Sequence, residues 1–411
     1  MTPSGNRVVR GDPDAAESSG GLRVGARVAL IGLALAAGVA FETVVHHPVE
    51  PPEGFSLAPP TSNAALTPAV ARVQAQWINP DPLTATCHAS SIALMPDGSM
   101  ATVWWGGTRE GAADVSLYLS RRPAGVNTAW TPPELLLSPE AAESEISRNI
   151  RKLGNAVLFA DPQSRLWLVY VSVSVGGWSG SALNVKRSDD GGRTWTASQR
   201  LSLGPFFNFS TLVRSKPFFS SDGWIALPVY HEFVRKHAEI LWWKPGVEHS
   251  VGQFHIRHAA VRPGLMQPSV VTLDGTRGVM VLRDTNDSRR LTVSSTADAG
   301  WTWTDPEEIA LQNPDAGVDL LKLPDGRLLL AYNEGHTGRH HLRLAVSSDE
   351  GRTWQPGPYV ENEDSGEYSY PSLALDRSGD VHLTYTWRRE RIRHVTFSTT
   401  WLDQPVVSAS L

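Results

Sequence analysis

Along most of the chain, apolar and β-branched stretches alternate with short turns built on Asp and Gly. Such turns recur roughly every fifty to sixty-odd residues, at 96–98, 161–162, 222–223, 274–275, 325–326 and 376–379. Asp-Gly between β-rich runs is a strong hairpin signal, because both central residues of such a turn tolerate a positive φ. Helical periodicity is nearly absent after residue 73. The pattern predicts an all-β fold of six repeated units.

Repeats of this length suit one closed architecture. Each repeat has room for four short strands, and a ring of four-stranded blades leaves only short, protected edges. The 15 Trp, 35 Gly and 29 Pro residues suit many short strands joined by tight turns. We therefore predict that residues 74–411 form a six-bladed β-propeller.

The residues before the repeats differ in kind. Within 1–45, an apolar run over 28–41 follows four arginines, Arg7, Arg10, Arg23 and Arg27. The run is short for a membrane-spanning helix, which needs about 17–25 residues, and fits a secretion signal; read on through Val45, it is also a marginal membrane anchor. Either interpretation predicts that the rest of the chain is exported, to the periplasm or beyond. Residues 46–73, rich in Pro and Ala, predict a linker.

Composition narrows the choice of partners and cofactors. The net charge of −5 and the lack of a long basic block argue against a nucleic-acid partner held by phosphate neutralisation. The single cysteine, Cys87, excludes an internal disulfide framework and a Cys-rich zinc site. The sequence has no recognised metal-ligand spacing and no Gly-rich phosphate loop after a strand. We expect a monomer without metal or cofactor.

A second recurrent element has the pattern S/T-x-D-x-G-x-T-W. It occurs three times, at 188–195, 296–303 and 347–354. The Asp can accept bonds from backbone N–H groups, the Gly takes a strained turn position, and the Trp anchors the hairpin by burying apolar area. These segments resemble the Asp-box of the sialidase (neuraminidase) superfamily, whose members contain BNR repeats. We interpret the boxes as structural and assign their acids no catalytic role.

The resemblance implies a sialidase-like propeller that acts on glycans. Enzymes of this superfamily hold a substrate carboxylate with three arginines, attack with a tyrosine assisted by a glutamate, and use an aspartate as acid and base. An arginine fork binds a planar carboxylate in bidentate fashion. A neutral tyrosine avoids the repulsion that a carboxylate nucleophile would meet beside an anionic sugar.

Several residues match the positions that the resemblance implies. Arg290 and Arg339, each ahead of an Asp-box, resemble the second and third arginines. The segment 367–370 resembles the one that carries the nucleophile, which indicates Tyr368, with Glu367 beside it. The polar loop 106–114 lies where the superfamily keeps its acid/base residue, which indicates Asp114 and then Glu110. Further substrate-binding candidates are Arg283 and His231. His231 lies at the end of a predicted strand, where the polar residues either line a pocket or simply end the strand in solvent.

Two positions depart from the superfamily pattern. His88 stands where the first arginine is expected, and a histidine offers one bond in place of a fork. Gln267 stands where the glutamate partner of the tyrosine is expected, and an amide cannot accept a proton. Another acid would then serve the tyrosine, and the candidates are Glu367, Glu334 and Glu232.

Three functions follow from these matches and departures. The first is a retaining exo-glycosidase that removes a terminal acidic sugar, sialic acid or a relative, with Tyr368 as nucleophile. The second is another glycosidase, or a lyase acting on uronate-containing glycans, in which histidine and tyrosine do acid/base work. The third is a non-catalytic glycan-binding propeller.

A basic cluster near the C-terminus, Arg388, Arg389, Arg391 and Arg393, is interpreted as a solvated hairpin.

Overall fold

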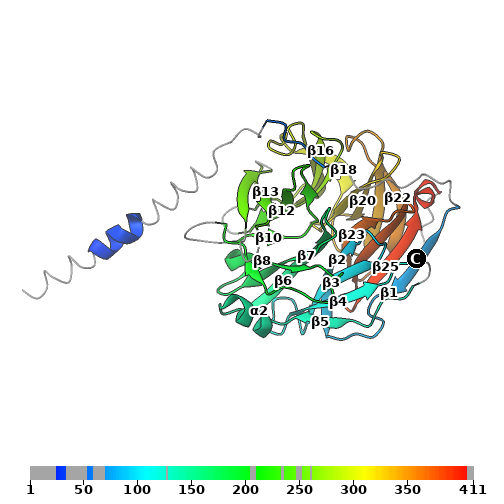
Figure 1. Ribbon diagram of the computed structural model, residues 1–411. Coiled ribbons are helices and arrows are strands. Elements are labelled where there is room, and N and C mark those ends of the chain that lie inside the picture. The colour runs from blue at the N-terminus through cyan, green and yellow to red at the C-terminus, as the bar shows by residue number, and fades with distance from the viewer. Residues whose placement is uncertain are drawn as a thin grey trace, which may run out of the picture. The chain divides into compact units, whose positions relative to one another are not determined.

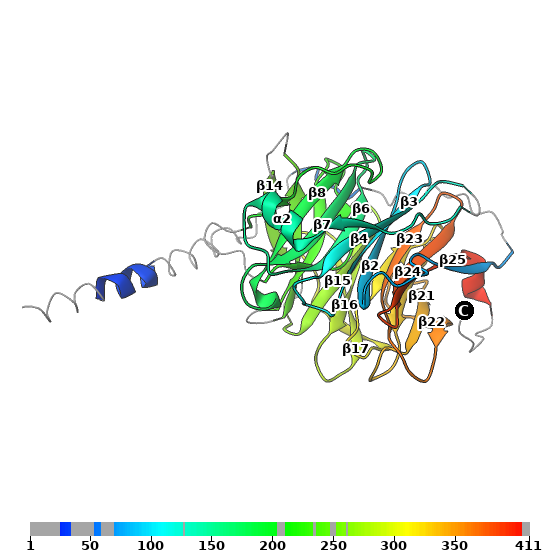
Figure 2. The ribbon, with the colours of Figure 1, turned by 90° about the horizontal axis from the view of Figure 1, so that it is seen from below.

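The computed structural model describes residues 25–33, 53–58, 70–125, 128–203, 210–232, 236–246, 252–259 and 262–404. In these residues the strands form six antiparallel sheets, which we call blades 1 to 6 in chain order. The blades surround a common centre (Figure 1, Figure 2). The predicted all-β, six-bladed propeller is confirmed.

The bounds of the elements follow the chain. Blade 1 contains β2 (Thr86–Leu94), β3 (Met100–Gly107), β4 (Ser116–Arg122) and β5 (Glu134–Leu137). Blade 2 contains β6 (Lys152–Ala160), β7 (Leu166–Val173), β8 (Ser181–Ser188) and β9 (Gln199–Arg200). Blade 3 contains β10 (Leu212–Val213), β11 (Phe218–Phe219), β12 (Ile225–His231), β13 (His237–Lys244) and β14 (Gln253–His258).

The later blades follow the same order. Blade 4 contains β15 (Leu265–Thr272), β16 (Gly278–Asp284), β17 (Arg290–Thr296) and β18 (Glu307–Gln312). Blade 5 contains β19 (Asp319–Lys322), β20 (Leu328–Asn333), β21 (His341–Ser347) and β22 (Gln355–Asn362). Blade 6 contains β23 (Tyr368–Leu375), β24 (Asp380–Trp387), β25 (Arg391–Ser398) and β1 (Val73–Trp77). Short helical segments are α2 (Pro139–Ile146), η2 (Trp178–Gly180) and η3 (Thr399–Asp403).

Blade 6 combines strands from the two ends of the propeller sequence. β1 pairs antiparallel with β25, with Val73 opposite Phe397 and Trp77 opposite Arg393. The two strands lie side by side in blue and red in Figure 1. Because the first strand completes the last sheet, the ring closes through main-chain hydrogen bonds and β25 has no open edge.

The predicted turns and Asp-boxes lie at regular places in the blades. In five blades the Asp-containing turn joins the first strand to the second, and in blade 3 it joins the two-residue strand β11 to β12. Each Asp-box follows the third strand of its blade, in blades 2, 4 and 5. In the first box, Asp190 accepts hydrogen bonds from the amide and hydroxyl of Thr194 at 2.9 and 2.7 Å, and the Trp195 indole donates to Gly192 at 3.1 Å. These contacts close the turn locally, as the structural interpretation predicts.

The first strands of several blades carry a β-bulge near the same end of the ring. The register shifts between His88 and Ser91 in β2, between Met266 and Ser269 in β15, and between Ser369 and Ser372 in β23. A bulge turns a side chain out of the strict alternation of a strand. At each of these three bulges a non-glycine residue has a positive φ: 56° at Ala89, 51° at Gln267 and 52° at Tyr370. Such backbone costs about 1–3 kcal/mol per residue and often occurs at functional sites.

Part of the predicted linker packs against the propeller. Leu57 is 3% exposed, and its amide donates to the carbonyl of Gly275 at 2.7 Å. Phe55 contacts the rings of Trp242 and Trp301 edge-on, with centroids 5.2 and 5.5 Å apart. Residues 53–58 therefore form an apolar strap on blades 3 and 4, because two large apolar side chains interrupt the Pro- and Ala-rich composition.

The predicted signal or anchor is described only in part. Residues 25–33 are helical with exposed side chains, and the remainder of the apolar run 28–41 lies outside the described residues. Among the helices that the structure describes, none has the length and apolar character needed to cross a membrane.

Candidate functional site

A small polar cavity of about 220 Å³ lies at the end of the ring that carries the bulges. All six blades contribute to its wall. The lining residues are Glu110, Asn155, Trp178, Leu212, Tyr230, Glu232, Gln267, Arg283, Arg339, Tyr370 and Arg389. Three arginines, two carboxylates and two phenols in so small a space form a candidate active site.

A larger hollow of about 660 Å³ lies elsewhere, against the turn ends of blades 1 and 2. Its wall consists of hairpin and Asp-box residues, among them Asp97, Asp190 and Arg193. The Asp190 carboxylate is already engaged in closing its own turn. We therefore place the chemistry in the smaller cavity, where residues from every blade converge and five of the six blades contribute a charged group.

Tyr370 occupies the centre of a cationic and aromatic cluster. Its ring lies 4.9 Å from the guanidinium of Arg214 and 5.5 Å from that of Arg339. The imidazole of His88 meets the ring edge-on, with centroids 4.6 Å apart. Burial raises the pKa of Tyr370, but the charges of Arg283 and Arg339 and a hydrogen bond with Gln267 outweigh burial, and the net shift is downward. The site therefore stabilises the phenolate of Tyr370 relative to that of an ordinary tyrosine.

Gln267 links the two tyrosines of the cavity to an arginine. Its side-chain amide nitrogen donates to the hydroxyl of Tyr230 at 3.2 Å, and its oxygen accepts from Arg283 at 3.0 Å. A side chain at Gly317 would meet the Gln267 oxygen at 3.0 Å and the Tyr370 ring at 3.3 Å. Glycine at this position thus leaves room for both residues.

Three arginines reach the cavity from different blades. Arg283, at the end of β16, donates to the carboxylate of Asp315 at 2.5 Å. Arg339, just before β21, donates to the main-chain oxygen of Asp315 at 3.3 Å. Arg389, in the turn between β24 and β25, has a φ of 57° and donates to Glu110 at 3.0 Å. Each guanidinium is oriented by an acceptor of the protein itself.

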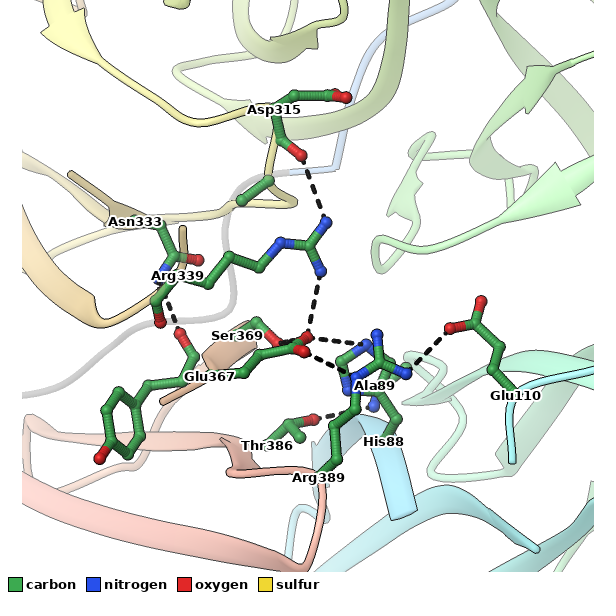
Figure 3. Close-up of polar contacts among 12 residues, drawn as sticks. His88, Ala89, Glu110, Asp315, Asn333, Arg339, Glu367, Ser369, Thr386 and Arg389 are labelled. Carbon is green, nitrogen blue, oxygen red and sulfur yellow. Dashed lines mark hydrogen bonds and ion pairs between the residues drawn. The ribbon is translucent and has the colours of Figure 1, made fainter. Parts of the chain in front are cut away.

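Glu367 lies between two of these arginines (Figure 3). One of its oxygens accepts from Arg389 at 2.6 Å, and the other accepts from Arg339 at 3.2 Å and from the Ser369 hydroxyl at 2.8 Å. Burial raises the pKa of Glu367, but the bond and charge of Arg389 lower it more, so the carboxylate is ionised. We infer that Glu367 holds the arginines in place and does not face the cavity itself.

His88 lies beneath the cavity and does not line it. Its side chain is 3% exposed, and its Nε2 is 3.6 Å from Glu367, too far for a hydrogen bond. Burial and the charges of Arg389, Arg339 and Arg214 hold the pKa of His88 well below its usual range. The neutral His88 ring packs edge-on against Tyr370. Arg389, from the β24–β25 hairpin, supplies the third guanidinium of the cavity.

Two acids remain in the cavity wall. Glu110 accepts from Arg389 and is about half exposed. Burial raises the pKa of Glu232, which follows β12 and whose amide is held by the Ser210 hydroxyl at 2.7 Å. Of the acids considered for assisting the tyrosine, only Glu232 lines the cavity. Glu334 binds Arg343 at 2.7 Å and Tyr359 at 2.5 Å in blade 5.

Besides Glu367 and His88, four more residues predicted for the site lie outside the cavity. Tyr368 is 1% exposed, packs in the apolar core of blades 5 and 6, and accepts from Arg388 at 3.0 Å. Asp114 accepts from the amide and hydroxyl of Thr108 at 2.9 and 3.0 Å and closes its loop. Arg290 is the first residue of β17, the third strand of blade 4, where it lies opposite Gln312 of β18 in the strand register. His231 binds Glu239 at 2.7 Å.

The pocket arginine that the sequence did not indicate is Arg389. It belongs to the hairpin that was expected to be solvated. Two other arginines of that hairpin, Arg391 and Arg393, lie outside the cavity, with their guanidinium groups 4.1 and 4.9 Å from the centre of the Trp77 ring. Arg388 and Arg389 both have positive φ, at 52° and 57°, which sets them apart from the alternation of the strands. The expectation of a solvated hairpin was therefore wrong for Arg389, because the turn directs it to the cavity.

The lowered pKa of Tyr370 is open to a direct test. A phenol whose pKa lies below its ordinary value loses its proton first as the pH rises, whereas burial raises the pKa of Tyr230. In an ultraviolet difference titration we expect Tyr370→Phe to remove the earliest tyrosinate signal. Tyr230→Phe is the control and should leave that early step in place; an unchanged titration of Tyr370→Phe would contradict the assignment.

Comparison with known proteins agrees with this architecture. Residues 98–383, more than half of the chain, match the BNR repeat-like domain family. A sialidase of Bacteroides fragilis is 24% identical over 231 residues, which are 52% of this chain and 40% of that protein. The chain thus spans about two fifths of this relative.

Solved structures show the same fold at low sequence identity. The Hadza microbial sialidase Hz136 is similar at a TM-score of 0.64 and 18% identity, over 78% of this chain and 67% of that one. A protein of unknown function from Dyadobacter fermentans has a TM-score of 0.61 and 17% identity, over 79% and 99%. The intramolecular trans-sialidase of Ruminococcus gnavus has a TM-score of 0.60 and 14% identity, over 79% and 97%. The chain belongs to the BNR repeat-like domain family, within the sialidase/BNR superfamily.

Proposed function

We propose that the protein is a glycoside hydrolase that removes a terminal acidic sugar, sialic acid or a relative, with retention of configuration. One observation carries the proposal: three guanidinium groups and the phenol of Tyr370 line one small cavity. An anionic sugar carboxylate is the ligand that clustered arginine forks recognise best. The named activities of the similar sialidases support the same chemistry.

The arginines form the carboxylate-binding side of the site. Arg283 and Arg339 are tied to Asp315, and Arg389 is tied to Glu367, so each guanidinium is positioned before substrate arrives. Preorganisation reduces the entropy lost when the ligand binds. Arg389 takes the place that the superfamily gives to an arginine on the first strand of blade 1, where this chain has His88.

Tyr370 replaces Tyr368 as the nucleophile. Its oxygen forms a bond to the anomeric carbon while the bond to the leaving oxygen breaks, and Glu232 accepts the phenol proton. Glu110 donates a proton to the leaving oxygen and later takes one from the water that attacks the anomeric carbon, while the bond to Tyr370 breaks and Glu232 returns its proton to the tyrosine oxygen. Asp114 is engaged in closing its loop, so the acid/base role passes to Glu110.

The experiment that tests this proposal is hydrolysis of a sialoside reporter by the full chain. We expect release of the reporter from the sialoside and none from a matched galactoside, which lacks the carboxylate. Retention is checked by proton NMR of the first sugar product. Absence of turnover across a panel of linkages and pH values would overturn the hydrolase proposal.

Replacing Arg389 should separate binding from chemistry. Arg389→Ala removes a guanidinium from the carboxylate site, and charge-assisted hydrogen bonds of this kind contribute about 1.5–3 kcal/mol. We expect KM for the sialoside to rise roughly tenfold to a hundredfold, with a smaller fall in kcat. Arg391→Ala is the matched control, because Arg391 lies over Trp77 in the same hairpin and outside the cavity; an equal effect of both changes would count against a carboxylate-binding role.

Gln267 favours one alternative, a glycan-binding propeller without turnover. Its amide hydrogen-bonds with Tyr230 and Arg283, and an amide cannot accept the proton of Tyr370. In that case calorimetry would detect binding of sialic acid that Arg389→Ala weakens, while no reporter is released. Glu232→Gln distinguishes the two: it should abolish turnover in the hydrolase and leave binding in the binder nearly unchanged.

A further inference from the structure

Blade 3 carries a group of side chains that the proposed reaction does not use. His231 at the end of β12 and His237 at the start of β13 face each other as the last register pair of their ladder. Glu239 follows two residues after His237 and so lies on the same face of the sheet. The three side chains thus converge where the hairpin leaves the blade.

The ligand atoms of these residues are already close together. His231 Nε2 is 2.7 Å from one oxygen of Glu239, and His237 Nε2 is 3.4 Å from the other. The two imidazole rings are stacked, with centroids 4.6 Å apart and planes 9° apart. All three ligand atoms lie within 4.8 Å of one another. No other group of three His, Cys, Asp or Glu side chains in the described part of the chain meets this spacing.

This spacing suits a tetrahedral metal ion. Zinc binds histidine nitrogen and carboxylate oxygen at about 2.0–2.2 Å, which places neighbouring ligand atoms about 3.3 Å apart. His237 Nε2 lies at about that distance, 3.4 Å, from Glu239 Oε1. His231 Nε2 contacts the other oxygen, Oε2, at 2.7 Å, so a carboxylate that binds the ion through Oε1 requires the His231 ring to shift. Both imidazole rings are partly exposed, and small rotations about their side-chain torsions supply such a change.

Burial and ligand type narrow the class of metal. Glu239 is 6% exposed, whereas His231 and His237 are 19% and 28% exposed, so the carboxylate forms the floor and the imidazoles face the open side. Two imidazoles and one carboxylate suit zinc and related transition metals, while calcium and magnesium prefer all-oxygen sites. Three protein ligands leave a fourth position for water.

We propose that His231, His237 and Glu239 bind one divalent transition-metal ion of the zinc class. The ion would tie the last residue pair of the β12–β13 ladder together. Tyr230 and Glu232 flank His231 in the chain and line the cavity, so the site stands beside the candidate active site without belonging to it. The proposal is independent of the proposed hydrolase function.

Titration of the full chain with Co²⁺ tests the site through the visible absorption of the bound ion. We expect one equivalent to bind with a spectrum typical of four-coordinate nitrogen and oxygen ligation, and Zn²⁺ to displace it. His231→Ala and His237→Ala should each weaken binding at least tenfold, on the order of the losses seen when metal sites are disturbed. His340→Ala is the matched control, because His340 also lies beside a second histidine, His341, with the rings edge-on and their centroids 4.2 Å apart, but it lies outside the three-residue group.

Thermal unfolding supplies a second measurement that needs no enzyme activity. An ion that binds only the folded chain raises its midpoint, so Zn²⁺ should raise the midpoint of the wild type and of His340→Ala but not that of His237→Ala. Circular dichroism confirms that each variant retains the sheet structure. Binding that persists equally in His231→Ala and His237→Ala, or no binding by the wild type at millimolar Co²⁺, overturns the proposal.

Discussion

Tyr370→Phe should lower kcat for a sialoside by about a thousandfold or more, because it removes the oxygen that attacks the sugar. Three features single out this phenol. It lines the cavity, it lies between the guanidiniums of Arg214 and Arg339, and its pKa is lowered by the charges of Arg283 and Arg339 despite burial. The ring itself remains in Phe, so packing against His88 should persist and KM should change little. The measurement is steady-state hydrolysis with burst analysis for a covalent intermediate.

Tyr368→Phe is the matched control for this prediction. Both tyrosines belong to β23, but Tyr368 is in the apolar core and loses only its contact with Arg388. We expect its kcat to stay within about threefold of the wild type, in line with a change remote from the reacting atoms. The reverse outcome, a large loss in Tyr368→Phe and a small one in Tyr370→Phe, would return the nucleophile to Tyr368.

The two tyrosines also show why the site was harder to predict than the fold. In a regular strand, residues 368 and 370 would face the same side. The bulge between Ser369 and Ser372, with a φ of 52° at Tyr370, directs one ring to the cavity and leaves the other in the core. A sequence pattern gives the strand but gives no signal for a bulge whose residues are not glycine.

The meeting of residues from different blades in one cavity was also hard to predict. Arg339, which precedes an Asp-box at a fixed distance, and Arg283 were both among the candidates, and both line the cavity. Arg389 and Glu232 come from turns of other blades, and their meeting depends on closure of the whole ring. The six Asp turns and three Asp-boxes, in contrast, are local structures stabilised by residues within a few positions, as Asp190 and Thr194 show. Local chemistry was therefore sufficient to predict the blades.

One carboxylate contributes most clearly to closure of the ring. Asp319, in the first strand of blade 5, is 4% exposed. It accepts from the Ser269 hydroxyl of blade 4 at 2.9 Å, from the Leu373 amide of blade 6 at 2.8 Å, and from the ammonium of Lys216 of blade 3 at 3.2 Å. Lys216 also donates to the carbonyl of Leu373 and to Ser372. Four blades thus meet at a single side chain.

Asp319→Ala should lower the free energy of unfolding by about 3–5 kcal/mol, because it leaves a buried amide, a hydroxyl and the Lys216 ammonium without their shared acceptor. Lys216 keeps two other acceptors and is 24% exposed, so we expect a value near the lower end of that range. The measurement is urea unfolding, with the change in midpoint taken at unchanged slope.

Two further variants show whether the loss belongs to the network. Asp97→Ala removes an acid whose contacts are confined to Ser99 within its own turn, and it should cost less than about 1 kcal/mol. Lys216→Met in the Asp319→Ala background removes the ammonium that has lost its carboxylate partner, and it should recover part of the stability, since a largely buried charge without a counter-charge is less favourable than an apolar side chain. If the double variant were no more stable than Asp319→Ala, the loss would come from the amide and hydroxyl contacts between blades 4, 5 and 6, and the ion pair with blade 3 would contribute little to closing the ring.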